Sequence, residues 1–289
     1  MIKNKGILYA FIAVLLWATL GIGFKLAVSR LDSFAVTVYV GFFATLFLLI
    51  YLILKGKIKN TWNTFKKNWL FFIIIGIIGL GIQQILYLKG YQLLPASNVV
   101  IIFYLYPLLM LLISGLFFKE KTSPLSYLFI LIGFIGLYIL ISKGTLMNIS
   151  LSLGIIVTIL AALSWAIFSI FIKYKEFDVD IGMFLFNLFG LIFLICMIPI
   201  FKFTWNVTTY EILGMIYLGI FPTAIAFVFW NKALQTTKTH ICSNIALLTP
   251  LFSIILIVII LKETIVLSQI IAMILILGSV FLNLKFGKN

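Results

Sequence analysis

Hydrophobic residues run along this chain in long, uninterrupted stretches, and polar residues gather in short breaks between them. A helix that crosses the hydrocarbon core of a bilayer needs about 20 apolar residues. Ten stretches of about that length lie near residues 7–28, 34–54, 69–91, 97–118, 125–142, 153–173, 181–201, 211–234, 241–261 and 267–285. They are apolar all round, whereas the strands of a membrane barrel alternate apolar and polar residues. The pattern predicts an all-α polytopic membrane protein with ten transmembrane helices.

The composition excludes the main alternatives to a membrane protein. Hydrophobic residues make up 64% of the 289 positions and charged residues 10%, against roughly 45–50% and 25% in a soluble domain. So few charges exclude a soluble globular fold, a disordered chain and a nucleic-acid-binding domain. The longest connection between stretches, Lys55 to Asn68, has 14 residues and holds five lysines. No soluble domain fits there, so any function must lie within the membrane.

The net charge of +14 is read as a signal for orientation. If the N-terminus is cytoplasmic, 15 of the 21 basic residues fall on the cytoplasmic side of the ten-span map. Cytoplasmic loops of membrane proteins carry an excess of lysine and arginine. We therefore expect a multi-pass protein of the cell membrane with both termini in the cytoplasm.

The chain also repeats itself. An offset of 148 residues aligns Trp17 and Ala18 with Trp165 and Ala166, and Lys25 with Lys173. An offset of 143 aligns Gly76, Lys89, Pro107 and Glu120 with Gly219, Lys232, Pro250 and Glu263. The predicted halves are residues 1–147 and 148–289, with five spans each. Because five is odd, the second half enters the membrane from the opposite side, an inverted repeat typical of secondary transporters. An inherited duplication in a channel or a membrane enzyme is the alternative.

Several segments carry a resemblance to a known family. They are Leu16-Trp17-Ala18, Ser164-Trp165-Ala166, Asn231-Lys232-Ala233-Leu234, Pro107–Glu120 and Pro250–Glu263. With the repeat, they make essentially the whole chain resemble the EamA-type members of the drug/metabolite transporter superfamily. The match departs at Leu88-Lys89-Gly90-Tyr91, where glycine replaces the usual alanine. The resemblance implies a central cavity lined mainly by the first, third, fourth, sixth, eighth and ninth helices, and export or exchange of small metabolites, often amino acids.

Polar residues within the spans indicate where such a cavity lies, because they must face protein or water. Gln83, Tyr87 and Tyr91 recur every four residues and share one helix face. The repeat offset of 143 residues aligns Tyr87 of the first half with Trp230 of the second half. The predicted cavity residues are Trp17, Gln83, Tyr87, Tyr104, Trp165, Trp230 and Asn244. Packing and interhelical hydrogen bonds are the alternative role for each of them.

The few charges near span ends suggest a gate at each mouth. In the ten-span map Lys25, Lys89 and Glu263 lie near the outer ends, and Lys173, Lys232 and Glu120 near the inner ends. An ion pair across the halves would latch one side closed while the other opens. Simple snorkelling of these side chains to the headgroups is the alternative.

Proline and glycine residues suggest how the spans bend and pack. Pro107 and Pro250 each remove a backbone hydrogen bond near mid-span and are predicted to kink their helices. A symmetric pair of hinges is one interpretation and a fixed bend is the other. We expect the glycines at positions 76, 79, 81, 133 and 136 to allow close helix packing.

Catalytic and metal chemistry finds little support in the sequence. Cys196 and Cys242 are far apart within apolar stretches, and His240 is the only histidine. No aspartate or glutamate falls in the middle of a span, so uniport or exchange is favoured over proton coupling. We predict a transporter, not an enzyme, without cofactor or metal. Its expected partners are a small-molecule substrate and the bilayer, as a monomer or homodimer. A channel-like pore for small solutes, or less favourably a membrane-embedded enzyme, is the alternative.

Overall fold

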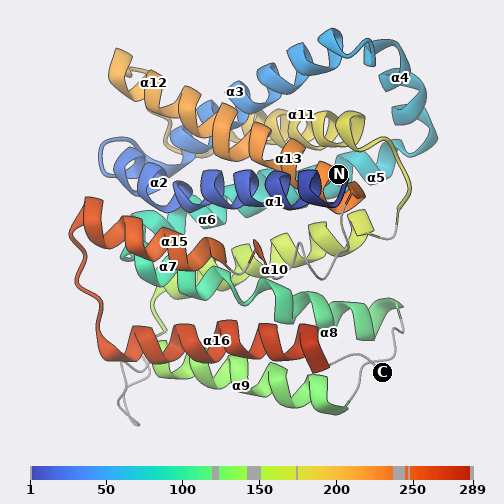
Figure 1. The fold of residues 1–289 in the computed structure, drawn as a ribbon. Coiled ribbons are helices and arrows are strands. Elements are labelled where there is room, and N and C mark those ends of the chain that lie inside the picture. Colours follow the sequence, from blue (N-terminus) through green and yellow to red (C-terminus); the bar gives the residue numbers. More distant parts are fainter. Residues whose placement is uncertain are drawn as a thin grey trace.

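The computed structural model describes residues 2–118, 124–141, 151–173, 175–236, 245–246 and 248–286, and its regular structure is helical throughout these ranges (Figure 1). Four residues named in the sequence analysis lie outside the described residues: Glu120, His240, Cys242 and Asn244. The side chains of Pro107 and Lys173 also lie outside the description. For the four residues, and for the side chains of these two, the sequence-based expectations stay predictions.

The helices follow one another with short connections. Residues 1–147 contain α1 (Ile2–Ala18), α2 (Leu20–Val28), α3 (Ser33–Leu54), α4 (Ile58–Lys67), α5 (Trp69–Gly76), η1 (Ile77–Ile82), α6 (Gln83–Leu93), α7 (Ala96–Phe103), α8 (Tyr106–Phe118) and α9 (Pro124–Ile141). Residues 148–289 contain α10 (Leu153–Lys173), α11 (Val179–Met197), α12 (Thr209–Leu218), η2 (Gly219–Ile225), α13 (Ala226–Thr236), α15 (Leu248–Leu256), η3 (Ile257–Leu261) and α16 (Leu267–Phe286). The three η segments are π-helical turns that continue their neighbouring α-helices.

Within the described ranges, seven helices are long and apolar enough to cross a membrane. They are Lys5–Val28, Ser33–Leu54, Trp69–Leu93, Ala96–Phe117, Leu153–Ile172, Val179–Met197 and Thr209–Trp230. Shorter apolar helices cover Pro124–Leu140, Leu248–Leu261 and Leu267–Leu282. The chain is a multi-pass membrane protein, and the ten-span map with its inverted repeat stays a prediction.

One segment differs from the sequence-based expectation. Residues 55–68 were expected to be a plain connection, but α4 forms within them. Its residues Ile58, Trp62 and Phe65 share one face. Lys59 and Lys66 flank this face, and Lys67 lies on the opposite side of the helix. The apolar spacing of three to four residues is that of an amphipathic helix, and it was obscured by the density of lysines.

The span that contains Pro107, Ala96–Phe117, is interrupted by a turn at residues 104 and 105. Proline has no backbone N–H to donate to the carbonyl four residues earlier, and α7 ends at that residue, Phe103. Helical structure resumes at Tyr106 in α8. Pro250 lies buried within α15. A hinge role for either proline stays a prediction.

The predicted close packing at the glycines is confirmed. A Cβ added to Gly76 would lie 2.8 Å from the carbonyl oxygen of Phe186 in α11, and one added to Gly219 would lie 2.7 Å from that of Val40 in α3. Each contact brings the backbones of the two halves together. A Cβ added to Gly79, Gly81, Gly133 or Gly136 would lie 3.0 Å or less from side-chain atoms of Phe168, Phe193, Leu108 or Ile276, respectively. A larger side chain at these positions would require the neighbouring side chains to shift.

The helices α3 and α11 pack against each other in antiparallel directions. A different aspartate connects the two helices at each end of the pair. We call the first contact the Asp32 junction: Asp32 caps α3 through the Ala35 N–H at 2.8 Å and accepts a bond from the Thr204 N–H, which follows α11, at 3.0 Å. We call the second the Asp178 junction: Asp178 caps α11 and pairs with Lys57, which follows α3, at 3.0 Å. Each junction therefore ties the start of one helix to the segment after the other.

Candidate binding cavity

A cavity lies among the helices of both halves. Its lining residues come from α1, α2, α6, α7, α8, α10, η2, α13 and α15, together with Tyr104 between α7 and α8. The space open to the centres of water molecules is about 80 Å³. Because one water needs roughly 10–15 Å³ by this measure, the cavity has room for several waters or one small organic molecule.

Aromatic rings form much of the cavity wall, from two opposite sides. Phe227 of α13 meets Trp17 at 5.6 Å and Trp165 at 5.3 Å between ring centroids. Tyr87 meets Phe24 edge-on at 6.1 Å and Phe103 at 4.3 Å. These distances suit mutual aromatic packing, which fixes the rings while leaving their faces and edges toward the space. Packed aromatic rings therefore make much of the wall apolar.

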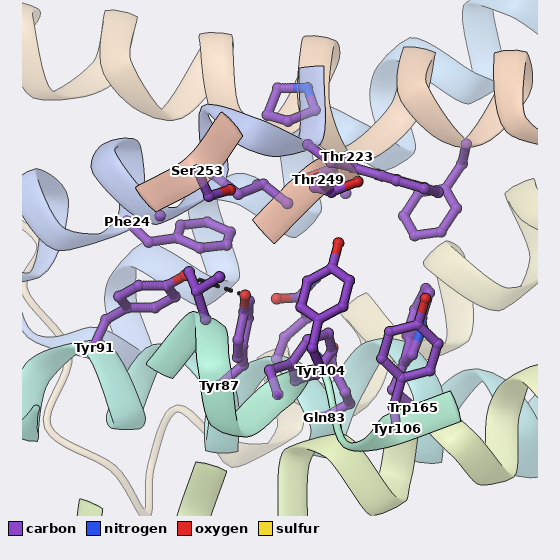
Figure 2. Close-up of a pocket in the computed structure, with 18 residues that line it drawn as sticks. Phe24, Gln83, Tyr87, Tyr91, Tyr104, Tyr106, Trp165, Thr223, Thr249 and Ser253 are labelled. Carbon is purple, nitrogen blue, oxygen red and sulfur yellow. Dashed lines mark hydrogen bonds between the residues drawn. The ribbon is translucent and has the colours of Figure 1, made fainter. Parts of the chain in front are cut away.

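Tyrosine hydroxyls add a polar edge to this wall. The Tyr87 and Tyr91 hydroxyls are 3.1 Å apart and hydrogen-bond to each other, as the dashed line in Figure 2 shows. In the same view, the Tyr104 hydroxyl points across the cavity toward Thr249 of α15. Hydroxyl groups both donate and accept hydrogen bonds. The site thus offers donors as well as acceptors without carrying a charge.

Two glutamines at the start of α6 carry the most informative polar atoms. The side-chain carbonyl oxygens of Gln83 and Gln84 are buried and have no hydrogen-bond partner within the described part of the chain. Both residues line the cavity, and Gln83 is only 2% exposed. A buried acceptor without a partner costs roughly 1–3 kcal/mol. A water or a ligand with an N–H or O–H donor would remove that cost.

The cavity lining contains no charged side chain among the described residues. Apolar, weakly hydrated surroundings disfavour a solute with net charge unless an opposite charge meets it. The arrangement therefore fits a net-neutral organic molecule that has hydrogen-bond donors and an apolar surface. Groups that would hold a metal ion are likewise not found in the described ranges.

The structure brings together five of the seven residues predicted from sequence. Trp17, Gln83, Tyr87, Tyr104 and Trp165 all line the cavity. Trp230 lies behind this lining, with its ring 5.2 Å from that of Trp17. Asn244 falls outside the described residues. Whether these side chains bind a substrate stays a prediction.

Several lining residues were missed by the sequence analysis. Tyr106 follows Tyr104 by two residues, and the rings lie 5.7 Å apart. Helical spacing separates residues two apart, so only the break before Pro107 brings them together. Thr223 lies in η2, where its hydroxyl bonds the carbonyl of Leu218, five residues earlier. A π-helical turn alters the usual periodicity, and the sequence gives no direct sign of it except the nearby Pro222.

Glu263 makes a contact between the halves, but its partners differ from those predicted. Its carboxylate accepts bonds from the Ala96 N–H at 2.8 Å and the Ser97 N–H at 3.2 Å, and from the Ser97 hydroxyl at 2.8 Å. A carboxylate at the start of a helix is stabilised by the free N–H groups there. We call this contact the Glu263 cap.

The lysines predicted to pair with Glu263 bind other groups. The Lys25 ammonium donates to the carbonyls of Tyr91 and Leu94 at 2.9 and 2.7 Å. Lys89 donates to the side chain of Gln92 at 2.7 Å. Within the described residues both ion pairs belong to Lys57. The direct lysine–glutamate latch is therefore replaced here by bonds to helix ends, because the break between α6 and α7 exposes carbonyls and N–H groups to Lys25 and Glu263.

The remaining predicted gate residue with a described side chain lies elsewhere. Lys232 of α13 stands over the rings of Tyr51 and Phe229, with its ammonium 5.8 and 5.9 Å from their centroids. Such cation–π contacts stabilise a lysine within an apolar environment. Its predicted partner Glu120 is outside the described residues, so the second gate stays a prediction.

Comparisons with known proteins agree with one another. The EamA-like transporter family matches residues 4–142 and 152–285. An uncharacterized transporter of Clostridium kluyveri is 23% identical over 99% of this chain and 95% of its own length. The uncharacterized transporter YoaV of Bacillus subtilis is 26% identical over 75% of this chain and 76% of its own. A solved crystal structure has the same fold, with a TM-score of 0.68 at 21% identity, over 98% of this chain and 97% of that one.

Proposed function

Because the chain belongs to the EamA-like transporter family, we propose that it moves a small, net-neutral organic metabolite across the cell membrane by alternating access. The family and the relatives named as transporters make it a membrane transporter and not an enzyme. The observation that carries the proposal further is the uncharged, aromatic cavity with two unpartnered glutamine oxygens. The substrate, the direction and the cycle are our inference.

The chemistry of the cavity favours an amino acid or a related compound. The ammonium group of a zwitterion has N–H donors for the oxygens of Gln83 and Gln84. The hydroxyls of Tyr104, on the same side of the space as Gln83 in Figure 2, and of Thr249, across the space, would donate to its carboxylate. An apolar side chain would pack on the rings of Trp17 and Phe227. A zwitterion has no net charge, which suits a lining without charged residues.

Export or exchange fits this lining better than proton-driven uptake. A proton relay within a membrane commonly uses a buried carboxylate or histidine, and the described lining contains neither. We therefore expect flux that follows the substrate gradient or exchanges one substrate for another. We place both termini in the cytoplasm by the distribution of lysines.

The cycle we propose uses two halves that exchange shapes. Three contacts support it: Gly76 against α11, Gly219 against α3, and the antiparallel α3–α11 pair with an aspartate at each end. The π-helical segments η1 and η2 also follow the repeat, since residues 77–82 and 220–225 are 143 apart. In this cycle the Glu263 cap closes one end of the cavity near Tyr91, and a counterpart at Glu120 closes the other.

Transport assays on purified protein in liposomes test the proposal. A thermal-shift panel of amino acids and neutral metabolites identifies a ligand, and its radiolabelled form is then used for counterflow. We expect saturable counterflow that a pH gradient does not drive. Trp17→Ala and Tyr87→Ala should each lower it about tenfold or more, because both remove aromatic wall. Unchanged kinetics in both variants would refute the cavity assignment, and unsaturable flux without counterflow would favour a channel-like pore.

A further inference from the structure

The helix α4 stands apart from the other helices in direction and in composition. In Figure 1 the long helices run roughly along one direction, and α4 lies across it at the edge of the molecule, between the ends of α3 and α5. Because α3 and the helix from Trp69 to Leu93 are both apolar enough to cross the membrane, α4 lies where the chain leaves and re-enters the bilayer. Its axis is therefore roughly in the plane of the membrane surface.

The side chains of α4 suit a helix that lies between the hydrocarbon region and the headgroup region of the bilayer. Trp62 is 59% exposed and Ile58 is 38% exposed, which is costly for an apolar face unless lipid covers it. Phe65, on the same face, stacks on Phe189 of α11 at 5.2 Å and so fixes the helix to the protein. Tryptophan favours the boundary between hydrocarbon and headgroups. Exposed apolar side chains on a helix at the membrane surface are suited to contact with lipid.

The charges on α4 have one sign. The segment from Lys55 to Asn68 holds five lysines and no acidic residue. Lys57 is occupied by its ion pairs with Asp178 and Asp180. Lys59 and Lys67 are exposed, and the ammonium of Lys66 lies 5.0 Å from the ring centroid of Trp62. A row of exposed lysines beside an exposed tryptophan complements the phosphate groups of acidic phospholipids.

We propose that α4 is a docking surface for acidic phospholipid headgroups in the leaflet that it borders. The lysines bind the headgroup phosphates, and Trp62 and Ile58 insert beside the acyl chains. The ion pairs of Lys57 connect the start of this docked helix to the start of α11 in the other half. Acidic lipid would therefore hold the two halves together at this side of the protein. By the predicted orientation, the leaflet is the cytoplasmic one.

The test compares two charge-matched variants of the purified full-length protein. Lys59→Gln/Lys67→Gln removes two exposed charges from α4, and Arg30→Gln/Lys202→Gln removes two exposed charges from the segments next to the Asp32 junction. Binding of phosphatidylglycerol is measured by native mass spectrometry in a background of phosphatidylcholine. We expect the α4 variant to lose about 25-fold in affinity, since each lysine near an anionic surface contributes roughly fivefold. The control should change by less than threefold.

A second measurement tests the position of the helix. Phospholipids brominated on their acyl chains should quench the fluorescence of the wild type more than that of Trp62→Phe. The difference between the two proteins is the quenching of Trp62, and it should be larger with brominated phosphatidylglycerol than with brominated phosphatidylcholine. Equal loss of lipid affinity in the two charge variants would overturn the proposal. So would full binding of free glycerol phosphate, because the site would then recognise a soluble anion. Neither readout depends on transport, so failure here leaves the proposed function to be judged separately.

Discussion

The cavity and the contacts between the halves differ in whether their polar atoms have hydrogen-bond partners. At the Asp32 junction and the Asp178 junction each carboxylate binds partners from both halves, and at the Glu263 cap a carboxylate of the second half binds groups of the first half. In the cavity the oxygens of Gln83 and Gln84 have no partner among the described residues. Polar groups whose hydrogen bonds are all formed stabilise one conformation. A buried polar atom without a hydrogen bond is instead free to bind a water or a ligand. We therefore expect changes at the contacts to affect stability, and changes in the cavity to affect transport.

The largest effect on stability is expected where the backbones of the halves touch. Gly76→Ala places a Cβ 2.8 Å from the Phe186 carbonyl oxygen, so the helices must separate. We expect the free energy of unfolding to fall by about 2–3 kcal/mol, measured by thermal unfolding in detergent. Gly214→Ala is the matched control, because no atom lies within 4 Å of its added Cβ. Similar melting temperatures for the two variants would contradict the packing argument.

Two buried glutamines sharpen the comparison directly. Gln83 in the cavity has an unpartnered oxygen, whereas Gln269 of α16 donates to Ser97 and Asn98. Gln83→Leu should lower transport about tenfold while leaving the melting temperature equal or higher, because an unsatisfied group is removed. Gln269→Leu should lower the unfolding free energy by about 1–3 kcal/mol and leave substrate affinity unchanged. If both variants lost stability equally, the oxygen of Gln83 would have a structural role.

The Glu263 cap tests whether one end of the cavity is held closed. Glu263→Gln weakens the charge-assisted bonds to the start of α7 and should lower the unfolding free energy by about 1 kcal/mol. It should also raise alkylation of a cysteine placed at Val100, which lines the cavity. The exposed Glu176 provides the control variant, Glu176→Gln. Unchanged alkylation in Glu263→Gln would mean that the cap stabilises α7 without gating.

The smallest expected effect is a difference between the two aspartate junctions in how their stability depends on pH. Burial opposes the charge of Lys57, but its hydrogen bonds to Asp180 and Asp178 outweigh this and raise its pKa. A raised lysine pKa gives stability that is complete below the unfolded value, near 10.4, and is lost as the pH rises through the folded value. The Asp32 junction has no lysine.

Alkaline pH should therefore loosen the Asp178 junction alone, by less than about 1 kcal/mol, because the pair is one-third exposed. Lys57→Arg keeps its charge at that pH. Its melting temperature should fall less than that of the wild type between pH 9 and pH 11. An equal fall in the two proteins would show that the ion pair contributes nothing measurable.

Much of the fold follows from the sequence because its main determinants are local. Apolar runs predict the helices, and glycines such as Gly76 predict positions of close helix packing. The helix α4 was missed because its lysines outweigh the apolar face of Ile58, Trp62 and Phe65. Partners of charged side chains were also beyond prediction. Glu263 and Lys25 bind the ends of α6 and α7, and such groups are revealed only by where a helix breaks.

Part of the cavity could be predicted from helical periodicity. Gln83 and Tyr87 lie on one face of a regular helix, and both were identified. Tyr106 and Thr223 reach the cavity through a helix break and a π-helical turn, which change which residues share a face. Trp230 was placed by the repeat offset, but it packs against Trp17 and is not part of the lining. Symmetry in sequence therefore indicates the right region and not the depth of each side chain.

The central claim is that substrate occupies the cavity during transport. The direct measurement uses protein in liposomes with Cys196 and Cys242 replaced by serine, a cysteine introduced as Val100→Cys in the cavity, and Ile271→Cys on the partly exposed α16 as control. We predict that the transported substrate slows alkylation at position 100 at concentrations that saturate counterflow, and leaves position 271 unchanged. Saturated counterflow with no protection at position 100 would contradict the claim.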